Sequence, residues 1–157
     1  EIVKATDGKV SAFVAGIGTG GTITGVGEVL KAEVPNVRII GVEPAGSAVL
    51  NGKSAGPHAI EGIGAGFVPS ILNRDIIDDV LMIEDREALD MTEALAREEA
   101  LLVGISSGAN VLAAQRVAEK LSPEDVVVTV LCDTGTRYFS IEEYFKRDSV
   151  QDQSSLL

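Results

Sequence analysis

Glycine is concentrated at two points along the chain, and it sets the turns around which the chain can fold. The chain holds 17 glycines in 157 residues, about 11% against a typical share near 7%. One cluster follows the apolar residues 10–15 and the other lies in a long loop; the members are Gly16, Gly18, Gly20, Gly21 and Gly25, then Gly62, Gly64 and Gly66. Glycine lets the backbone turn tightly or approach a ligand closely. We therefore expect Gly-rich turns between regular elements.

Apolar runs and helical periodicity alternate along the chain. Runs rich in β-branched residues predict strands at 10–15, 37–42, 80–83 and 126–131. Apolar residues three or four apart predict helices at 22–31, 85–99 and 109–120, the last with Ser106 or Ser107 as its N-cap. This alternation predicts an α/β fold: an open, mostly parallel, twisted sheet with helices on both faces, in three layers. We expect one domain over residues 1–145 and a flexible polar tail over 146–157.

The charge balance limits the partners of the protein. Thirteen Lys and Arg residues against 24 Asp and Glu residues give a formal net charge of −11, which repels phosphate backbones and anionic membrane surfaces. We therefore expect no nucleic-acid partner and no membrane partner. A single cysteine and the lack of a basic-then-apolar leader favour a cytoplasmic setting. One histidine and one cysteine leave too few ligands for a zinc site, so no metal site is predicted.

The turn at residues 16–22, Gly-Ile-Gly-Thr-Gly-Gly-Thr, carries the strongest local signal for a ligand. Its small residues let several backbone N–H groups converge, and the helix that follows adds its positive end, so the turn suits a phosphate. The glycines also match the dinucleotide-binding pattern, with Glu43 as the acid that would hold a ribose. The hydroxyls of Thr19 and Thr22 favour a phosphate monoester instead. A third interpretation is that the glycines only permit close packing of the helix on the sheet.

Four motifs occur in the order seen in one enzyme family. They are Gly-Thr-Gly-Gly-Thr-Ile-Thr-Gly at 18–25, Glu-Gly-Ile-Gly-Ala-Gly-Phe-Val-Pro at 61–69, Gly-Ile-Ser-Ser-Gly-Ala at 104–109 and Gly-Thr-Arg-Tyr at 135–138. The chain thereby resembles, over residues 1–145, the carboxyl-terminal half of cysteine synthases and cystathionine β-synthases, which are fold-type II pyridoxal-phosphate enzymes. The resemblance implies that Gly62 borders the substrate and that the 5′-phosphate of pyridoxal 5′-phosphate is held by Gly18, Thr19, Gly20, Gly21 and Thr22.

The resemblance also implies a residue just after the last strand whose hydroxyl binds the pyridine nitrogen of the cofactor. Two family patterns compete for the position: Pro-Ser-x-Gly places it at Asp133, and Pro-Asp-Ser places it at Thr134. We favour Thr134, because a carboxylate would stabilise a protonated pyridinium and deepen the electron sink, whereas a neutral hydroxyl suits direct β-elimination. Asp133 is then expected to point away, toward backbone N–H groups of its own turn.

The function implied by the resemblance is β-replacement on an activated serine, O-acetylserine or similar, with a sulfur donor, to make cysteine. The family carries its Schiff-base lysine in the amino-terminal half, and no lysine here sits in such a motif: Lys4, Lys9, Lys31, Lys53, Lys120 and Lys146. We therefore expect no catalytic residue in this chain, a missing amino-terminal half as its partner, and a homodimer at full length. The alternatives are a serine or threonine dehydratase, an NAD-binding domain, and a catalytically silent binding module.

Three further features are expected to have structural roles, and a fourth bears on the substrate. Cys132 is expected to be a small buried hydrophobe, because no histidine neighbours it in the sequence. His58 is expected to be solvated or to pack within its loop, and the acids between residues 84 and 93 to form a solvated helix face. Glu61 stands where the resembling family usually has glutamine, which places a charge near the active-site mouth and leaves the substrate preference open.

Overall fold

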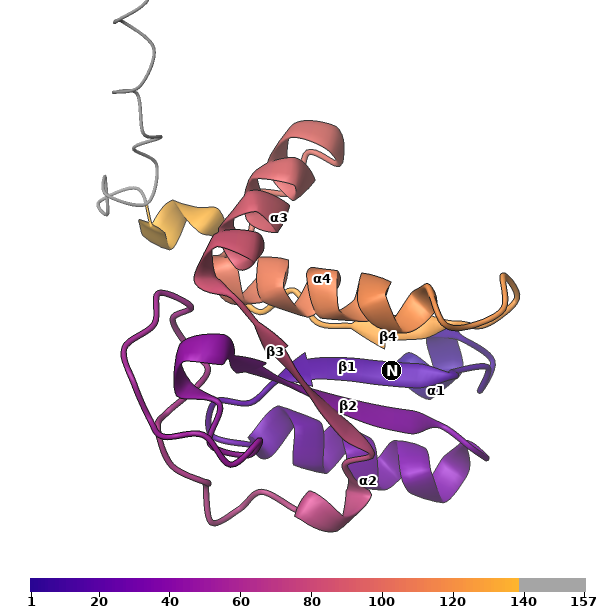
Figure 1. Cartoon of the computed structure of the whole chain (residues 1–157). Helices are drawn as coiled ribbons and strands as arrows, with labels where there is room; N and C mark the ends of the chain where they lie inside the picture. Colours follow the sequence, from indigo (N-terminus) through magenta and orange to yellow (C-terminus); the bar gives the residue numbers. More distant parts are fainter. Residues whose placement is uncertain (139–157) are drawn as a thin grey trace, which may run out of the picture.

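A sheet of four parallel strands forms the centre of the computed structural model, which describes residues 1–138 (Figure 1). The strands are β1 (Ala12–Gly16), β2 (Arg38–Pro44), β3 (Asp79–Ile83) and β4 (Val127–Thr129), in the spatial order β3-β2-β1-β4. Every neighbouring pair is parallel, so the carboxyl ends of all four strands lie at one edge. The predicted α/β fold with a parallel sheet is confirmed. The domain end predicted at residue 145 and the tail at 146–157 lie outside the described residues.

Helices cover both faces of this sheet. The long helices are α2 (Gly21–Glu33), α3 (Asp85–Glu98) and α4 (Ile105–Ala118), preceded by a short α1 (Ile2–Ala5); single turns of 3₁₀ helix are η1 (Ala45–Ser47), η2 (Arg74–Ile76) and η3 (Gly135–Tyr138). Figure 1 shows α2 below the sheet and α4 above it, with α3 packed beyond α4. Within residues 1–138, no helix combines the length and apolarity needed to cross a bilayer.

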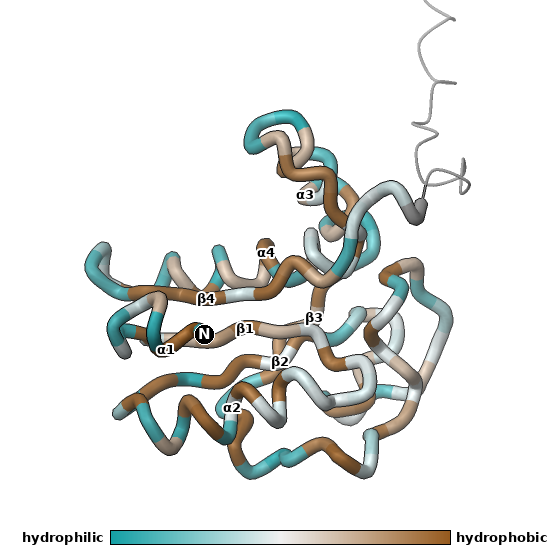
Figure 2. Tube along the Cα trace, turned by 180° about the vertical axis from the view of Figure 1, so that it is seen from behind, coloured by the Kyte–Doolittle hydropathy of each residue, from teal (hydrophilic) through white to brown (hydrophobic). Residues whose placement is uncertain are grey.

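The two faces of the sheet bury separate apolar clusters. In β1, Ala12 and Val14 pack toward α4, whereas Phe13 and Ala15 pack toward α2, and each is at most 2% exposed. Successive side chains of a strand point to opposite faces, so a strand covered on both sides is apolar at every position. Figure 2 shows this as hydrophobic colour along the central strands. The continuous apolar run of residues 10–15 thus reflects the three-layer arrangement.

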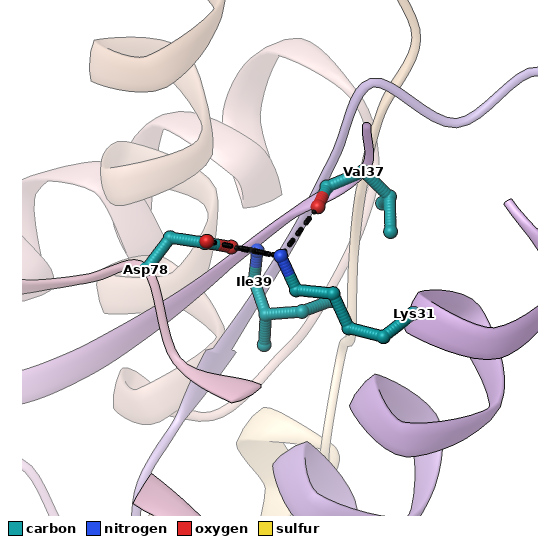
Figure 3. Close-up of polar contacts among 4 residues, drawn as sticks. All are labelled: Lys31, Val37, Ile39 and Asp78. Carbon is teal, nitrogen blue, oxygen red and sulfur yellow. Dashed lines mark hydrogen bonds and ion pairs between the residues drawn. The ribbon is translucent and has the colours of Figure 1, made fainter. Parts of the chain in front are cut away.

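One polar contact fixes the far end of α2 to the sheet (Figure 3). The ammonium group of Lys31 donates to the Val37 carbonyl at 2.8 Å and to Asp78 Oδ2 at 2.7 Å, while the Ile39 amide donates to the same Oδ2 at 2.6 Å. Burial alone would raise the pKa of Asp78, but the hydrogen bonds from Lys31 and Ile39 and the charge of Lys31 hold that pKa below its ordinary value. The contact joins α2, β2 and the residue before β3.

Several predicted boundaries are wrong by two residues or more, and three of them lie near the carboxyl edge of the sheet. Helix α4 begins at Ile105, with Gly104 as its N-cap, so Ser106 and Ser107 lie in the first turn and neither is the cap. The amide of Ser107 donates to the Gly104 carbonyl at 3.0 Å, which starts the helix four residues before the predicted 109. Strand β4 ends at Thr129, two residues before the predicted 131. Strand β2 continues to Pro44, which pairs with Ile83; proline is tolerated there because it ends the strand.

Candidate cofactor site

The site begins at the amino-terminal end of α2, directly after β1. Gly20 is the N-cap in the left-handed conformation, with φ of 86°, and no side chain caps the helix. The hydroxyl of Thr19 lies 3.5 Å from the Gly21 amide, at the limit of a hydrogen bond. The first amides of a helix have no partner within it and carry the positive end of its dipole. The turn thus presents N–H donors and positive potential to an anion.

Close packing explains why two positions of this turn are glycine. A side chain at Gly18 would collide with the carbonyl oxygen of Gly62, so the turn and the loop at 60–66 touch backbone to backbone. A Cβ atom at Gly20 would lie 3.1 Å from the Leu72 side chain, and the left-handed φ also favours glycine. The interpretation that the glycines permit close packing is therefore correct for these two positions. It does not account for Gly21, where a Cβ atom would meet nothing nearer than 3.7 Å.

Hydrogen bonds hold the second Gly-rich segment, residues 61–66, against the turn at residues 16–22. The Gly64 amide donates to the Ile17 carbonyl at 3.0 Å, and the Nε2–H group of His58 donates to the Gly64 carbonyl at 3.0 Å. Ile60, which precedes the segment, is fully buried. The loop-packing role expected for His58 is confirmed by its contact. These contacts hold residues 61–63 opposite the start of α2.

A cavity of about 390 Å³ lies between these two segments and the ends of α4 and β4. The residues that line it are Gly16, Gly18, Thr19, Gly20, Gly21, Thr22, Glu61, Gly62, Ile63, Ser106, Cys132 and Asp133. The cavity brings together all five residues of the predicted phosphate turn with the predicted substrate residue, Gly62. Thr134 is not among the residues that line it. Glu61, which the family resemblance placed near the active-site mouth, also lines the cavity, together with Ser106 and Cys132.

Ser106 and Ser107 connect α4 to the segment that follows β4. Ser107, fully buried, accepts a hydrogen bond from the Cys132 amide at 3.0 Å. Ser106, 4% exposed, lines the cavity and forms a hydrogen bond with the Cys132 thiol. The serines therefore position the wall of the cavity opposite the phosphate turn, which is a different role from the helix cap predicted for them.

Cys132 is exposed, so the expectation of a buried residue is wrong. Strand β4 ends three residues earlier, which leaves Cys132 in the loop that borders the cavity. Its Sγ atom still lies 3.6 Å from Asn110 Nδ2 and 3.8 Å from the Val130 carbonyl oxygen. Partial desolvation of this atom, followed by the negative charge of Asp133, raises the pKa of the thiol. The thiol is therefore kept in its neutral form.

The structure separates the two candidates for the pyridine nitrogen. Asp133 is among the residues that line the cavity, whereas Thr134 is not. The Thr134 hydroxyl lies 2.7 Å from that of Thr136, and the Thr134 backbone pairs with Val103. Backbone bonds from Gly104 to Asp133 and from Gly135 to Leu102, each 3.1 Å long, fix this segment. They hold the backbone of this segment beside the start of α4, which sequence spacing alone did not indicate. The role of Thr134 stays a prediction.

Glu43 does not face a ligand. It is 2% exposed, and its carboxylate accepts hydrogen bonds from the amides of Leu50 and Asn51, at 2.8 and 3.2 Å, and from Asn51 Nδ2 at 3.1 Å. These bonds hold the loop after β2 against the sheet. Both oxygens of the Glu43 carboxylate thus accept hydrogen bonds from within the protein. The dinucleotide interpretation, which requires this carboxylate to bind a ribose, is not supported by the structure.

The residues around the cavity fit a phosphate monoester. The donors on the α2 side are backbone amides and the hydroxyls of Thr19 and Thr22, which suit the several oxygens of a terminal phosphate. Gly21 also lines the cavity, and no atom lies within 3.7 Å of the position that a Cβ atom would take there. Ser106 and Asp133 line the same cavity. These features agree with the 5′-phosphate of pyridoxal 5′-phosphate, as the sequence predicted.

Comparison with known proteins gives the same family. Residues 1–133 match the family model described as "Pyridoxal-phosphate dependent enzyme". A cysteine synthase of Staphylococcus aureus is 46% identical over 145 residues, covering 92% of this chain and 47% of the relative. The chain thus spans about half the length of the curated relatives it matches.

Solved structures agree with the sequence comparison. The cysteine synthase of Entamoeba histolytica superposes with a TM-score of 0.88 at 40% identity, over 96% of this chain and 45% of that one. The O-acetylserine-dependent cystathionine β-synthase of Helicobacter pylori gives a TM-score of 0.83 at 44% identity, over 88% and 45%. The family and the cofactor predicted from the motifs are confirmed by these matches. The chain belongs to the family of pyridoxal-phosphate-dependent enzymes.

Proposed function

We propose that this chain forms the cofactor-phosphate half of a cysteine synthase-type enzyme. The full-length enzyme would replace the β-substituent of O-acetylserine, or a similar activated serine, with a sulfur nucleophile to make cysteine. The observation that carries the proposal is the uncapped amino terminus of α2, which opens into a cavity with Gly62 and Ser106 on its other walls. The similarity to cysteine synthases from two organisms supports it.

The residues of this chain would bind and orient the cofactor. The amides at the start of α2 and the hydroxyls of Thr19 and Thr22 would hold the 5′-phosphate. Gly62, which has no side chain to obstruct the cavity, would border the amino-acid substrate. Pyridoxal 5′-phosphate, when bound, supplies an electron sink that lets a β-substituent of an amino acid leave. Thr134 stays our candidate for the contact with the pyridine nitrogen, with Asp133 as the competitor.

The lysine that binds the cofactor covalently would come from sequence outside these 157 residues. No lysine is among the residues that line the cavity in the described part of the chain. The Lys31 ammonium group is already held by Val37 and Asp78 at the other end of α2. We therefore propose that an amino-terminal half completes the active site. The homodimer at full length and the cytoplasmic setting remain predictions from the sequence.

Thermal unfolding with candidate ligands tests the cofactor assignment. A ligand that binds only the folded state raises the melting temperature. We expect pyridoxal 5′-phosphate to raise it for the isolated chain and NAD to leave it unchanged. After borohydride reduction, no single lysine should carry the cofactor. A shift with NAD alone, or one defined pyridoxyl-lysine, would contradict the proposal.

Mixing this chain with the amino-terminal half of a cysteine synthase tests the activity. We expect cysteine to form from O-acetylserine and sulfide in the mixture and in neither half alone. Formation of an oxo acid from serine or threonine, without cysteine, would favour the dehydratase alternative instead. No turnover by a mixture whose halves demonstrably associate would contradict the proposed reaction.

A further inference from the structure

An apolar groove lies between α3 and the start of α4. It has a volume of about 180 Å³, and its walls include Leu89, Ala96, Leu102, Val103, Ile105 and Gly135. Within residues 1–138, no residue that lines this α3–α4 groove also lines the cofactor cavity. Leu102 keeps 47% of its surface exposed, although it is a large apolar residue. The groove is therefore a separate surface, open to an apolar partner.

The polar side chains beside the groove already have partners within the protein. Arg97 forms an ion pair with Glu93 at 3.8 Å, and the Thr92 hydroxyl donates to the Ala88 carbonyl at 2.8 Å. The remaining walls are apolar, so the groove favours a partner without charge. An apolar cavity of about 150 Å³ can hold a benzene ring. The dimensions of the α3–α4 groove therefore suit one aromatic side chain.

The chain carries aromatic side chains directly beyond this groove. Gly135 lines the groove and begins η3, which ends at Tyr138, the last residue that the structure describes (Figure 1). The sequence continues with Phe-Ser-Ile-Glu-Glu-Tyr-Phe at residues 139–145. Ile141, Tyr144 and Phe145 are three and four positions apart, a spacing that places side chains on one face of a helix. Fully extended, the chain from Tyr138 to Phe145 spans about 23 Å, so its length allows the aromatic residues to reach the groove.

The charges of this segment and of α3 are complementary. Lys146 and Arg147 follow Phe145 directly, whereas α3 contains five acidic residues and two arginines. A tethered segment also meets its binding surface at a high effective concentration, because it belongs to the same chain. The segment therefore combines apolar side chains, charge and proximity that match the groove.

We propose that residues 139–147 bind in the α3–α4 groove of the same molecule, with Tyr144 and Phe145 against Leu102. The groove is joined to the wall of the cofactor cavity, because the Gly104 amide donates to the Asp133 carbonyl and the Gly135 amide to the Leu102 carbonyl, each at 3.1 Å. The bound segment would therefore also stabilise the loop that carries Cys132 and Asp133. This inference does not depend on which reaction the full-length protein catalyses.

A double-mutant cycle in the 157-residue chain tests the contact. One change is Tyr144→Ala together with Phe145→Ala, the other is Leu102→Ala, and urea unfolding gives the equilibrium constant of each variant. Side chains in contact give non-additive effects, and we expect a coupling of roughly 2- to 150-fold in the unfolding constant. Val29→Ala is the matched control, because Val29 is 50% exposed on α2, across the sheet from α3 (Figure 1). It should not couple to the two aromatic residues.

Three results would overturn the proposal. Additive effects of the Leu102 and aromatic changes would show that the segment does not bind in the groove. A coupling that grows with protein concentration would place the segment on a second copy of the chain. A coupling between Leu102 and residues of an amino-terminal half, with none to Tyr144 and Phe145, would assign the groove to that half.

The reactivity of Cys132 tests the link between the groove and the cavity wall. Alkylation of the folded 157-residue chain by iodoacetamide should become about twofold faster, or more, when Tyr144 and Phe145 are both alanine, because the loop would open more often. Val150→Ala, a change beyond the segment, should leave the rate at its original value. Equal rates in all three proteins would overturn the proposed stabilisation of the loop.

Discussion

Gly18 and Gly62 touch backbone to backbone, with no space for a side chain between them. This contact joins the phosphate turn to the loop that borders the proposed substrate site. Two segments about 40 residues apart in the sequence therefore form one cavity wall. A change at either glycine should affect the geometry of both.

Gly18→Ala and Gly21→Ala separate packing from ligand binding. Alanine at 18 would collide with the Gly62 carbonyl, whereas alanine at 21 would meet only Ile71 and Thr19, at 3.7 Å. We expect Gly18→Ala to lower the melting temperature and weaken phosphate binding together. Gly21→Ala should weaken phosphate binding while leaving the melting temperature of the free chain near its original value. Calorimetric titration and thermal unfolding measure the two effects. Full phosphate affinity in Gly21→Ala would argue against a ligand at that position.

Removing the hydroxyls of the turn should weaken phosphate binding by a moderate amount. Hydrogen bonds to charged groups contribute about 1.5–3 kcal/mol, so Thr19→Val and Thr22→Val should each weaken binding about 10- to 150-fold. Thr92→Val on α3 is a control, because its hydroxyl bonds to the Ala88 carbonyl, outside the cavity. Isothermal titration with inorganic phosphate gives the affinities. Losses of equal size in all three variants would show that the effect is not specific to the turn.

The reactivity of Cys132 reports on the cavity. Partial desolvation of the sulfur and the charge of Asp133 raise the pKa of the Cys132 thiol, so alkylation should begin at higher pH than for a free cysteine. Asp133→Asn removes the second cause and should speed alkylation by iodoacetamide at pH 7.5. Pyridoxal 5′-phosphate should slow it, because Cys132 lines the cavity. Mass spectrometry follows the reaction at the single cysteine. A rate insensitive to both changes would place Cys132 away from the bound cofactor.

The contact between Lys31 and Asp78 should make stability depend on pH. The pKa of Asp78 is lowered in the folded state, so its stabilising contribution is complete above the ordinary aspartate pKa of about 4 and is lost as the pH falls through the folded value. Asp78→Asn should therefore lower the free energy of unfolding at pH 7 and have little effect near pH 2. Asp90→Asn removes an exposed ion pair with Arg86 and should cost less. Urea unfolding at both pH values is the measurement; a loss independent of pH would contradict the role of the ion pair.

Substitutions in the full-length enzyme decide between Thr134 and Asp133. If Thr134 contacts the pyridine nitrogen, Thr134→Ala should lower cysteine formation, Thr134→Ser should retain most of it, and Asp133→Asn should be mild. Because Asp133 lines the cavity and Thr134 does not, the opposite order of damage would be informative. Greater damage from Asp133→Asn than from Thr134→Ala would assign the contact to the carboxylate.

Local patterns predicted the elements that depend on local physics. The apolar run at residues 10–15 corresponds to β1, because a strand buried on both faces is apolar at every position. The helical spacing of Ile23 and Leu30 corresponds to α2, because a helix that packs on one face carries its apolar residues on that face. The start of α4 was missed, because Gly-Ile-Ser-Ser resembles a turn until Gly104 is seen to act as the cap.

The part of the site that backbone groups form could be predicted from the sequence. The phosphate turn depends on glycines and a helix end, which are visible in the sequence. The exposure of Cys132 and the position of Asp133 at the cavity depend on where β4 ends and on backbone bonds to the segment before α4. The contact between Lys31 and Asp78 joins residues 47 apart. Such details follow from packing between distant segments, and sequence spacing does not encode them.

Amide NMR during titration with pyridoxal 5′-phosphate tests the phosphate assignment most directly. We predict saturable chemical-shift changes that are largest at the amides of Gly20, Gly21, Thr22 and Ile23, with smaller changes at Gly62 and Ser106. Inorganic phosphate should move the first four and leave Ser106 nearly unaffected. Changes confined to surface lysines and arginines, or none at the start of α2, would contradict a cofactor-phosphate site at this turn.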